Sequence, residues 1–498
     1  MSALKKLAGQ TAVYGISSIL GRVFNYLLTP LYTYSFVQEK YGEVSEMYAY
    51  VAFFIVFLTF GMETAFFKFS STEDNKSKVY NTAFTSVIFT SVTFILFGLL
   101  FTQSIADFIG YASRPDFVIY FALILGIDAF CSIPLASLRQ ENKAKRFAVI
   151  NLTNIGTTIF FNLLFIAFAK TNYENGNHTV LVDFLYNPEI GVAYVFIANL
   201  LASIVKLLML YPEVIKLRWE FDIKLLKIMV IYSFPIMIAG FAGIVNETFD
   251  RLLIRRMLEP EGGTVFAKEQ VAIYSGVYKL AILISLFIQA FRYAAEPFFF
   301  AHAKQKDGKL IYARVMNYFV LAVSIMFLFV LFYLDILKYF LPPSYWEGLK
   351  IVPILLFANI FLGIYYNQSI WYKLTGQTKY GAFIAIGGAL LTVGLNILLI
   401  PILGYVASAW TTFFVYAGMM VASYFLGQKH YPIPYNLKKV GFYLSFALVL
   451  YGLSWCFKSY ITENLGAILS FNSALMFFYL WFAVNLEGIK LKDILKKT

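Results

Sequence analysis

The sequence predicts an all-α polytopic membrane protein with about fourteen transmembrane helices, and three observations lead to this fold class. Of the 498 residues, 60% are hydrophobic and 14% are charged, whereas soluble globular chains average about 45–50% apolar and about 25% charged residues. The apolar residues come in blocks of about twenty, the length that crosses a bilayer core as a helix. Each block must satisfy its own backbone groups in lipid, which favours helices, and the alternating segments of a β-barrel are not seen.

The apolar blocks follow one another with short connections, and the weakest division between two of them lies at Pro401–Gly404. The longest connection on one side, residues 171–189, is too small for a soluble domain. Helices are expected at residues 10–36, 44–67, 80–106, 117–138, 148–169, 190–211, 228–250, 271–295, 315–338, 350–372, 380–400, 404–427, 438–457 and 467–486.

Lysine and arginine residues are concentrated on one side of this arrangement, which is the side of both chain ends. Basic residues mark cytoplasmic loops, so both termini are predicted in the cytoplasm and the number of helices is predicted to be even. The same rule accounts for most of the net charge of +12, and no nucleic-acid partner is expected. One segment on the sparse side breaks the rule, because it carries Arg255, Arg256 and Lys268.

Two parts of the chain look related by a shift of 234 residues. The shift aligns Lys145 with Lys379 and the stretch 162–166 with 396–400, both of which begin with asparagine. This predicts two six-helix lobes in the same orientation, plus two C-terminal helices, and transporters built from such repeats bind substrate between the halves. The expected domains are an N-lobe at 1–211, a cytoplasmic interfacial linker at 212–227, a C-lobe at 228–427, and helices thirteen and fourteen with a basic cytoplasmic tail at 428–498.

Ionisable side chains at membrane depth are costly and rarely face lipid, which makes each a functional candidate. Glu247 and Arg251 are four residues apart, as are Arg292 and Glu296, so each pair can meet on one helix face. These pairs can be explained equally well in two ways: as functional residues, or as ion pairs that only lower the cost of burying the charges. Lys206 lies near a helix end and is expected to snorkel. The other polar candidates are Asn25, Glu46, Glu63, Asp128, Asn246, Asp250 and Gln289.

Arg22 and Lys279 have no carboxylate one helical turn away on their own helices. A cation that faces a bundle interior suits an anionic ligand such as phosphate, which arginine binds through a planar fork and lysine as a point charge. The chain has no phosphate-cradling GxxxxGK[ST] motif of an ATPase, and its three histidines fall in expected loops. These features favour a transporter over an enzyme, with no catalytic residue, no metal site and no cofactor other than a possible coupling proton or sodium ion.

Three blocks of sequence resemble the polysaccharide biosynthesis family of bacterial oligosaccharide flippases. The first seventy residues contain LKKLAGQTAVYGISSILGRVFNYLLTPLYTY followed by GMETAFFKF, and later blocks read YSFPIMIAGFAGIVNETFDRLLI and FIQAFRYAAEPFFF. That family belongs to a superfamily that also holds multidrug extruders and the lipid II flippase. The general pattern covers nearly the whole chain, and no short motif in it specifies the substrate.

The resemblance implies two six-helix lobes around a central cavity. It also implies a cargo, a polyprenyl-pyrophosphate-linked oligosaccharide moved from the inner to the outer leaflet of the bacterial inner membrane by alternating access, for surface polysaccharide assembly. A glycan polymerase and export machinery are possible partners. By analogy, Glu247 and Asp250 are candidates for ion coupling, and the pyrophosphate is held by cationic cavity residues, namely Arg22, Arg251, Lys279 and Arg292.

Three other functions remain open. A lipid II flippase of the same superfamily would be essential, so its loss would lyse cells instead of removing a surface glycan. A multidrug antiporter would have a cavity dominated by carboxylates, which the interior cations argue against. A membrane-bound glycan polymerase or acyltransferase, from a different class, would need a catalytic base and a sizeable outer loop.

Overall fold

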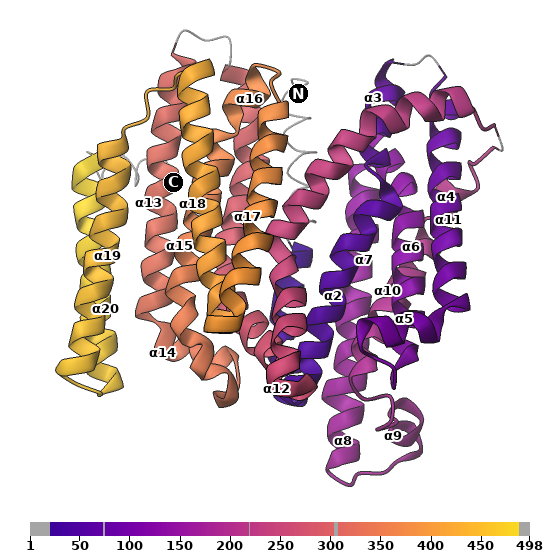
Figure 1. The fold of residues 1–498 in the computed structure, drawn as a ribbon, viewed down its shortest axis with the longest axis horizontal. Coiled ribbons are helices and arrows are strands. Elements are labelled where there is room, and N and C mark those ends of the chain that lie inside the picture. The colour runs from indigo at the N-terminus through magenta and orange to yellow at the C-terminus, as the bar shows by residue number, and fades with distance from the viewer. Residues whose placement is uncertain (1–19, 73–74, 219, 303–306, 488–498) are drawn as a thin grey trace. The chain divides into compact units, whose positions relative to one another are not determined.

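The computed structural model describes residues 20–72, 75–218, 220–302 and 307–487, and the regular structure within these ranges is helical throughout. The chain divides by its internal contacts into two units, Met1–Ala272 and Ile273–Thr498. Each unit is built from long helices, coloured indigo to magenta and magenta to yellow in Figure 1. The start of the first expected helix, residues 10–19, and the basic tail from residue 488 lie outside the described residues.

Twelve of the described helical stretches are long and apolar enough to cross a membrane. One of them, Ile223–Arg292, is 70 residues long and contains two of the expected spans, which are separated where Gly263 leaves the helical conformation at φ 79° and ψ 170°. Residues 20–35 form the described part of a further helix. The helices therefore account for the fourteen expected spans, and the predicted fold class is confirmed.

Unit 1 contains the helix at 20–35 and the elements that are coloured indigo to magenta in Figure 1. Its later elements include a π-helical stretch, η1, which continues directly from α7. The elements are α2 (Gln38–Thr59), α3 (Met62–Thr72), α4 (Lys76–Leu100), α5 (Thr102–Ile109), α6 (Pro115–Gln140), α7 (Ala144–Asn162), η1 (Leu163–Lys170), α8 (Thr171–Glu174), α9 (Val180–Leu185), η2 (Gly191–Ala193), α10 (Tyr194–Met209), α11 (Tyr211–Val214) and the first part of α12 (Ile223–His302).

Helices α4 and α6 pack closely because glycines lie at their contact. A Cβ atom added to Gly98 would lie 2.6 Å from the Cβ of Ala122, and one added to Gly126 would lie 2.3 Å from Cγ1 of Ile95. Small residues let helix backbones approach where lipid supplies no hydrophobic driving force between helices. This contact joins α4 and α6 within unit 1.

The segment expected as a linker, 212–227, is held against the rest of unit 1 by polar contacts. The buried Glu213 pairs with Arg146 of α7 at 2.9 Å, and its backbone carbonyl accepts a hydrogen bond from the Tyr80 hydroxyl at 2.8 Å. Asp222 caps the start of α12, where its carboxylate accepts bonds from two backbone N–H groups and lies 2.6 Å from Lys78 Nζ. Lys78 and these N–H groups lower the pKa of Asp222 to about 2.

Unit 2 contains the rest of α12 and the elements that follow it. Helices α19 and α20 pack on α13. One polar contact between them joins Asn472 of α20 to α13: its Nδ2 donates to the carbonyl of Phe332 at 2.8 Å. The elements are α13 (Gly308–Phe332), α14 (Leu334–Leu337), η3 (Lys338–Phe340), η4 (Pro343–Ile351), α15 (Val352–Gln368), α16 (Ile370–Leu374), α17 (Lys379–Leu403), α18 (Tyr405–His430), α19 (Leu437–Tyr460) and α20 (Leu465–Glu487).

The two asparagines aligned by the 234-residue shift adopt the same local arrangement in their separate units. Asn162 and Asn396 are both fully buried. The Nδ2 of Asn162 donates to the carbonyl of Thr158 at 2.7 Å, and the Nδ2 of Asn396 donates to that of Thr392 at 2.8 Å. The threonines are related by the same shift, so this shared hydrogen bond agrees with a duplicated unit. The division into lobes and linker stays a prediction.

The contact between α4 and α6 can be tested at its narrowest point. We expect Gly98→Ala to destabilise the protein by about 1–3 kcal/mol, because the added methyl overlaps Ala122 and overpacking costs that much. The melting temperature of the purified protein in detergent measures the effect. Gly156→Ala is the matched control, since no heavy atom outside the local helix lies within 4 Å of the position that its Cβ would take.

The double variant Gly98→Ala, Ala122→Gly distinguishes this contact from a general intolerance of α4. Removing the opposing methyl should restore most of the melting temperature. A double variant as unstable as Gly98→Ala alone would contradict the assignment.

Candidate functional site

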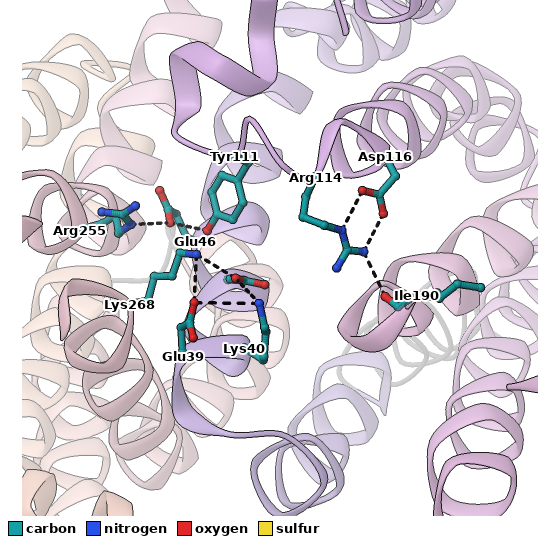
Figure 2. Close-up of polar contacts among 10 residues, drawn as sticks. Glu39, Lys40, Glu46, Tyr111, Arg114, Asp116, Ile190, Arg255 and Lys268 are labelled. Carbon is teal, nitrogen blue, oxygen red and sulfur yellow. Dashed lines mark hydrogen bonds and ion pairs between the residues drawn. The ribbon is translucent and has the colours of Figure 1, made fainter. Parts of the chain in front are cut away.

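A group of charged side chains connects the beginning of α2 with α12 inside unit 1 (Figure 2). The three α2 carboxylates, Glu39, Glu43 and Glu46, are four and three residues apart and therefore lie on one helix face. We call this group the α2–α12 ion cluster; its members are Glu39, Lys40, Glu43 and Glu46 from α2, and Arg255, Glu259 and Lys268 from α12.

Arg255 is the most deeply buried cation of the cluster, with 1% of its surface exposed. Its Nε lies 3.5 Å from Glu46 Oε2 and its Nη1 lies 2.5 Å from Glu259 Oε2. The same Glu46 oxygen accepts a hydrogen bond from the Tyr111 hydroxyl at 2.7 Å (Figure 2). Burial, followed by the neighbouring carboxylates Glu46 and Glu43, raises the pKa of Tyr111, so this hydroxyl remains a donor.

Lys268 forms the second half of the cluster. Its Nζ lies 2.8 Å from Glu43 Oε1 and 3.4 Å from Glu39 Oε1, and Lys40 approaches the same Glu43 oxygen at 2.9 Å. The backbones can come this close because residue 42 is glycine: a Cβ there would lie 2.1 Å from the carbonyl oxygen of Lys268.

The cluster explains the segment that breaks the charge asymmetry of the sequence. Arg255 and Lys268 are neutralised by carboxylates of α2 and α12 and are not exposed as free loop cations. Two further carboxylate oxygens, Glu43 Oε2 and Glu46 Oε1, are buried without a hydrogen-bond partner among the described residues. A carboxylic acid can donate through such an oxygen when protonated, so the cluster has positions that could take up a proton.

A separate charged contact, also drawn in Figure 2, fixes the start of α6. The guanidinium of Arg114 donates to both oxygens of Asp116, at 2.9 and 2.7 Å, and to the carbonyl of Ile190 at 3.0 Å. Bidentate pairs of this kind are specific in geometry. The contact holds the beginning of α6 beside the segment that leads into η2.

A second polar group on α12 contains three of the predicted site residues. Asn246 and Asp250 are buried. The Nη1 of Arg251 lies 2.8 Å from Asp250 Oδ1 and also donates to the backbone carbonyl of Glu247. Arg251 also lies near the buried Tyr41 of α2. The structure thus pairs Arg251 with Asp250, whereas the spacing suggested the carboxylate of Glu247, which belongs to an exposed residue.

Two other acidic candidates are paired inside unit 1. Asp128 of α6 lies 2.6 Å from Lys206 Nζ and accepts a hydrogen bond from Ser203 Oγ at 2.8 Å, both from α10. Lys206 therefore does not simply snorkel, as its place near a helix end suggested: its side chain is 11% exposed and joins two helices. Glu63 of α3 pairs with Arg139 at the end of α6.

The remaining candidates are divided between the two units. Arg22 and Asn25 lie on the helix at 20–35 in unit 1 and are exposed. Lys279, Gln289 and Arg292 are partly buried on α12 in unit 2. That these residues meet in one cavity stays a prediction.

Arg292 lies against aromatic rings within unit 2. Its guanidinium carbon is 4.1 Å from the centre of the Tyr366 ring, a cation–π contact between α12 and α15. The side chain of Glu296, its expected partner one turn later, lies outside the described part of the structure.

Sequence reasoning did not assign the ion cluster to a site, although signals for it were present. The cations on the sparse side were noted as an exception to the topology rule, and the carboxylates at 39, 43 and 46 share a helix face. The sequence does not show which carboxylate pairs with which cation, because more than 200 residues separate Glu46 from Arg255.

The sequence matches the profile of the family described as polysaccharide biosynthesis protein over residues 7–302. No curated protein sequence matches the chain. Among solved structures, the fold is similar to the lipid II flippase MurJ in an inward closed conformation, with a TM-score of 0.72 and 14% identity over 97% of this chain and 99% of that one. It is also similar to an inward-facing multidrug resistance MATE family transporter of the MOP superfamily, with a TM-score of 0.61 and 15% identity over 85% of this chain and 96% of that one.

The ion cluster predicts a measurable effect of removing one charge. We expect Lys268→Met to destabilise the protein by about 1.5–3 kcal/mol, because the buried Glu43 loses its charge-assisted contact with α12 and keeps only Lys40 of its own helix. The melting temperature in detergent measures this loss. Lys216→Met is the control, since its pair with Glu141 is exposed to solvent and such pairs contribute about 0–1 kcal/mol.

Adding Glu43→Gln to Lys268→Met removes the buried carboxylate that has lost its cation from α12, and should recover part of the lost stability. Equal melting temperatures for Lys268→Met and the wild type would show that the cluster does not hold α2 and α12 together.

Proposed function

The chain belongs to the polysaccharide biosynthesis protein family, and from this membership we propose that it is a flippase for a lipid-linked oligosaccharide. The family resemblance expected from the sequence is thereby confirmed. The observation that carries the proposal is the family match over residues 7–302, joined to a fold shared along 97% of the chain with a lipid II flippase.

In this proposal the cargo is a glycan on a polyprenyl pyrophosphate carrier in the bacterial inner membrane. The headgroup crosses through the polar interior while the lipid tail stays in the bilayer, and alternating access carries it from the inner to the outer leaflet. Both termini are cytoplasmic, a glycan polymerase and export machinery act after the flippase, and no covalent chemistry is required of the protein.

The pyrophosphate is bound by Arg22, Arg251, Lys279 and Arg292. The described contacts support a different role in pyrophosphate binding for three of these residues. Arg251 is held by Asp250, so an arriving phosphate competes with a carboxylate for the same guanidinium. Arg292 lies over Tyr366, which presents a ring face beside the cation. Arg22 is exposed on its helix and needs no rearrangement to meet an anion.

Coupling to a proton or sodium gradient is the second part of the proposal. Glu247 and Asp250 are the candidates from the sequence, and the geometry adds Glu43 and Glu46, each with a buried oxygen that has no partner among the described residues. Protonation of a carboxylate that neutralises a cation would weaken the ion pair, and this links ion binding to the position of α12 relative to α2.

A lipid II flippase is the second candidate function, and the similarity to the fold of MurJ favours it. The two flippases are distinguished by loss of the gene: lysis indicates lipid II, and a missing surface glycan with intact growth indicates another lipid-linked oligosaccharide. A multidrug antiporter, suggested by the similarity to MATE transporters, predicts drug sensitivity on deletion.

Transport can be measured after reconstitution into liposomes that contain a fluorescent polyprenyl-pyrophosphate oligosaccharide. We expect protein-dependent movement of the label across the membrane, reduced about tenfold or more by Arg22→Ala and by Lys279→Ala, because a charge-assisted contact with phosphate is worth roughly 1.5–3 kcal/mol. Lys76→Ala, an exposed cation at the start of α4, is the matched control. Repeating the assay with proton and sodium gradients identifies the coupling ion.

If both variants fold stably and transport at the wild-type rate, the cationic cavity is wrong. No movement with the wild-type protein would reject this cargo and direct the same assay to lipid II.

The predicted orientation can be tested by cysteine labelling in intact cells, in a background with Cys131→Ala and Cys456→Ala. Asn177→Cys lies in the long connection expected outside, and Ser77→Cys lies at the start of α4, expected inside; both positions are exposed. A membrane-impermeant maleimide should label only the first until the membrane is permeabilised. The reverse pattern would place both termini outside.

A further inference from the structure

Unit 1 has an apolar groove with a volume of about 500 Å³, which is the size of a ligand pocket. It lies between α2, α4, α5 and α6, near the end of the unit formed by residues 101–115, and its lining is almost entirely apolar. Phe97, Phe101 and Phe108 line it and have about half or more of their surface exposed. By the charge distribution of the sequence, this end of the unit faces the outer leaflet.

The cation Arg256 lies beside the groove. The exposed Arg256 donates from Nη2 to the carbonyl of Phe108 at 2.7 Å, and its guanidinium carbon lies 6.0 Å from the centre of the Phe108 ring. It also lies beside Tyr50, another residue of the lining. Arg256 therefore touches both α5 and α2 where they border the groove.

Arg256 retains donors for an anion. Among the described residues it forms no ion pair, unlike its neighbour Arg255. The carboxylate one turn later, Glu259, is held by Arg255 at 2.5 Å and by the Thr264 hydroxyl at 2.7 Å. Of the five N–H donors of a guanidinium, one is directed at the Phe108 carbonyl and another is shared with the Tyr50 hydroxyl, which leaves donors on this exposed side chain for an anion.

We propose that this groove binds one acyl chain of an anionic phospholipid from the surrounding leaflet, with the phosphate held by Arg256. A single cation matches the single charge of a phosphodiester, and an apolar lining matches a hydrocarbon chain. A pyrophosphate-linked glycan carries more charge and a polar sugar, and beside its apolar residues the groove offers only the hydroxyls of Ser104 and Tyr50.

Native mass spectrometry of the delipidated full-length protein tests the proposal by titration with phosphatidylglycerol and, separately, phosphatidylcholine. The first phosphatidylglycerol should bind more tightly than phosphatidylcholine. Arg256→Gln should weaken the phosphatidylglycerol affinity about fivefold and remove the preference, because a basic residue near a membrane surface contributes about 1 kcal/mol toward an anionic lipid. Ser104→Phe places a ring in the groove and should weaken both lipids.

Two matched controls accompany these variants, and the melting temperature of each variant checks its folding. Arg218→Gln removes another exposed arginine of unit 1, and Leu208→Phe adds a ring to an exposed position of α10. Both should bind phosphatidylglycerol as the wild type does.

Unchanged binding in folded Arg256→Gln or Ser104→Phe would overturn the site. Polyprenyl phosphate that displaces phosphatidylglycerol from the wild type, and is itself lost in Ser104→Phe, would assign the groove to the cargo tail and overturn the phospholipid. Because the measured quantity is lipid binding, a failure of transport activity leaves this test unaffected.

Discussion

The rule that a charge in hydrocarbon must meet an opposite charge determines the arrangement of unit 1. Deeply placed cations described there have a carboxylate partner: Arg255 has Glu46 and Glu259, Lys268 has Glu43, Lys206 has Asp128, and Arg251 has the adjacent Asp250. The pairs that join two helices fix the rotation of each helix about its axis. The glycine at position 42 follows from the same rule, because only a residue without a side chain allows α2 to approach the backbone at Lys268.

The helices of this fold could be predicted from the sequence because each one is a local property. A run of about twenty apolar residues is a helix in lipid whatever surrounds it, and the residue order alone gave fourteen such runs. Within the described part of the chain, the boundary at Gly263 is obscured, because two expected spans join there without a loop between them.

The site could be predicted only as a set of residues, because its contacts are between distant parts of the chain. Asp128 was recognised as an interior charge, but its partner Lys206 lies 78 residues later and was explained by its place near a helix end. Arg251 was paired by spacing with Glu247, while the structure brings the adjacent Asp250 to its guanidinium. Spacing along one helix shows which side chains can meet, and the packing of neighbouring helices decides which do.

The distance in sequence between the two halves of the ion cluster has a consequence for biosynthesis. The carboxylates of α2 are made more than 200 residues before Arg255 and Lys268, which at about 5–20 residues per second is an interval of roughly 10–40 s. During this time α2 has to enter the membrane with Lys40 as the one cation of its acidic end, so we expect that end to remain in contact with water or with the insertion machinery. When α12 is inserted, its Arg255 and Lys268 neutralise the acidic end of α2. The final placement of α2, which is made early, therefore depends on α12, which is made later.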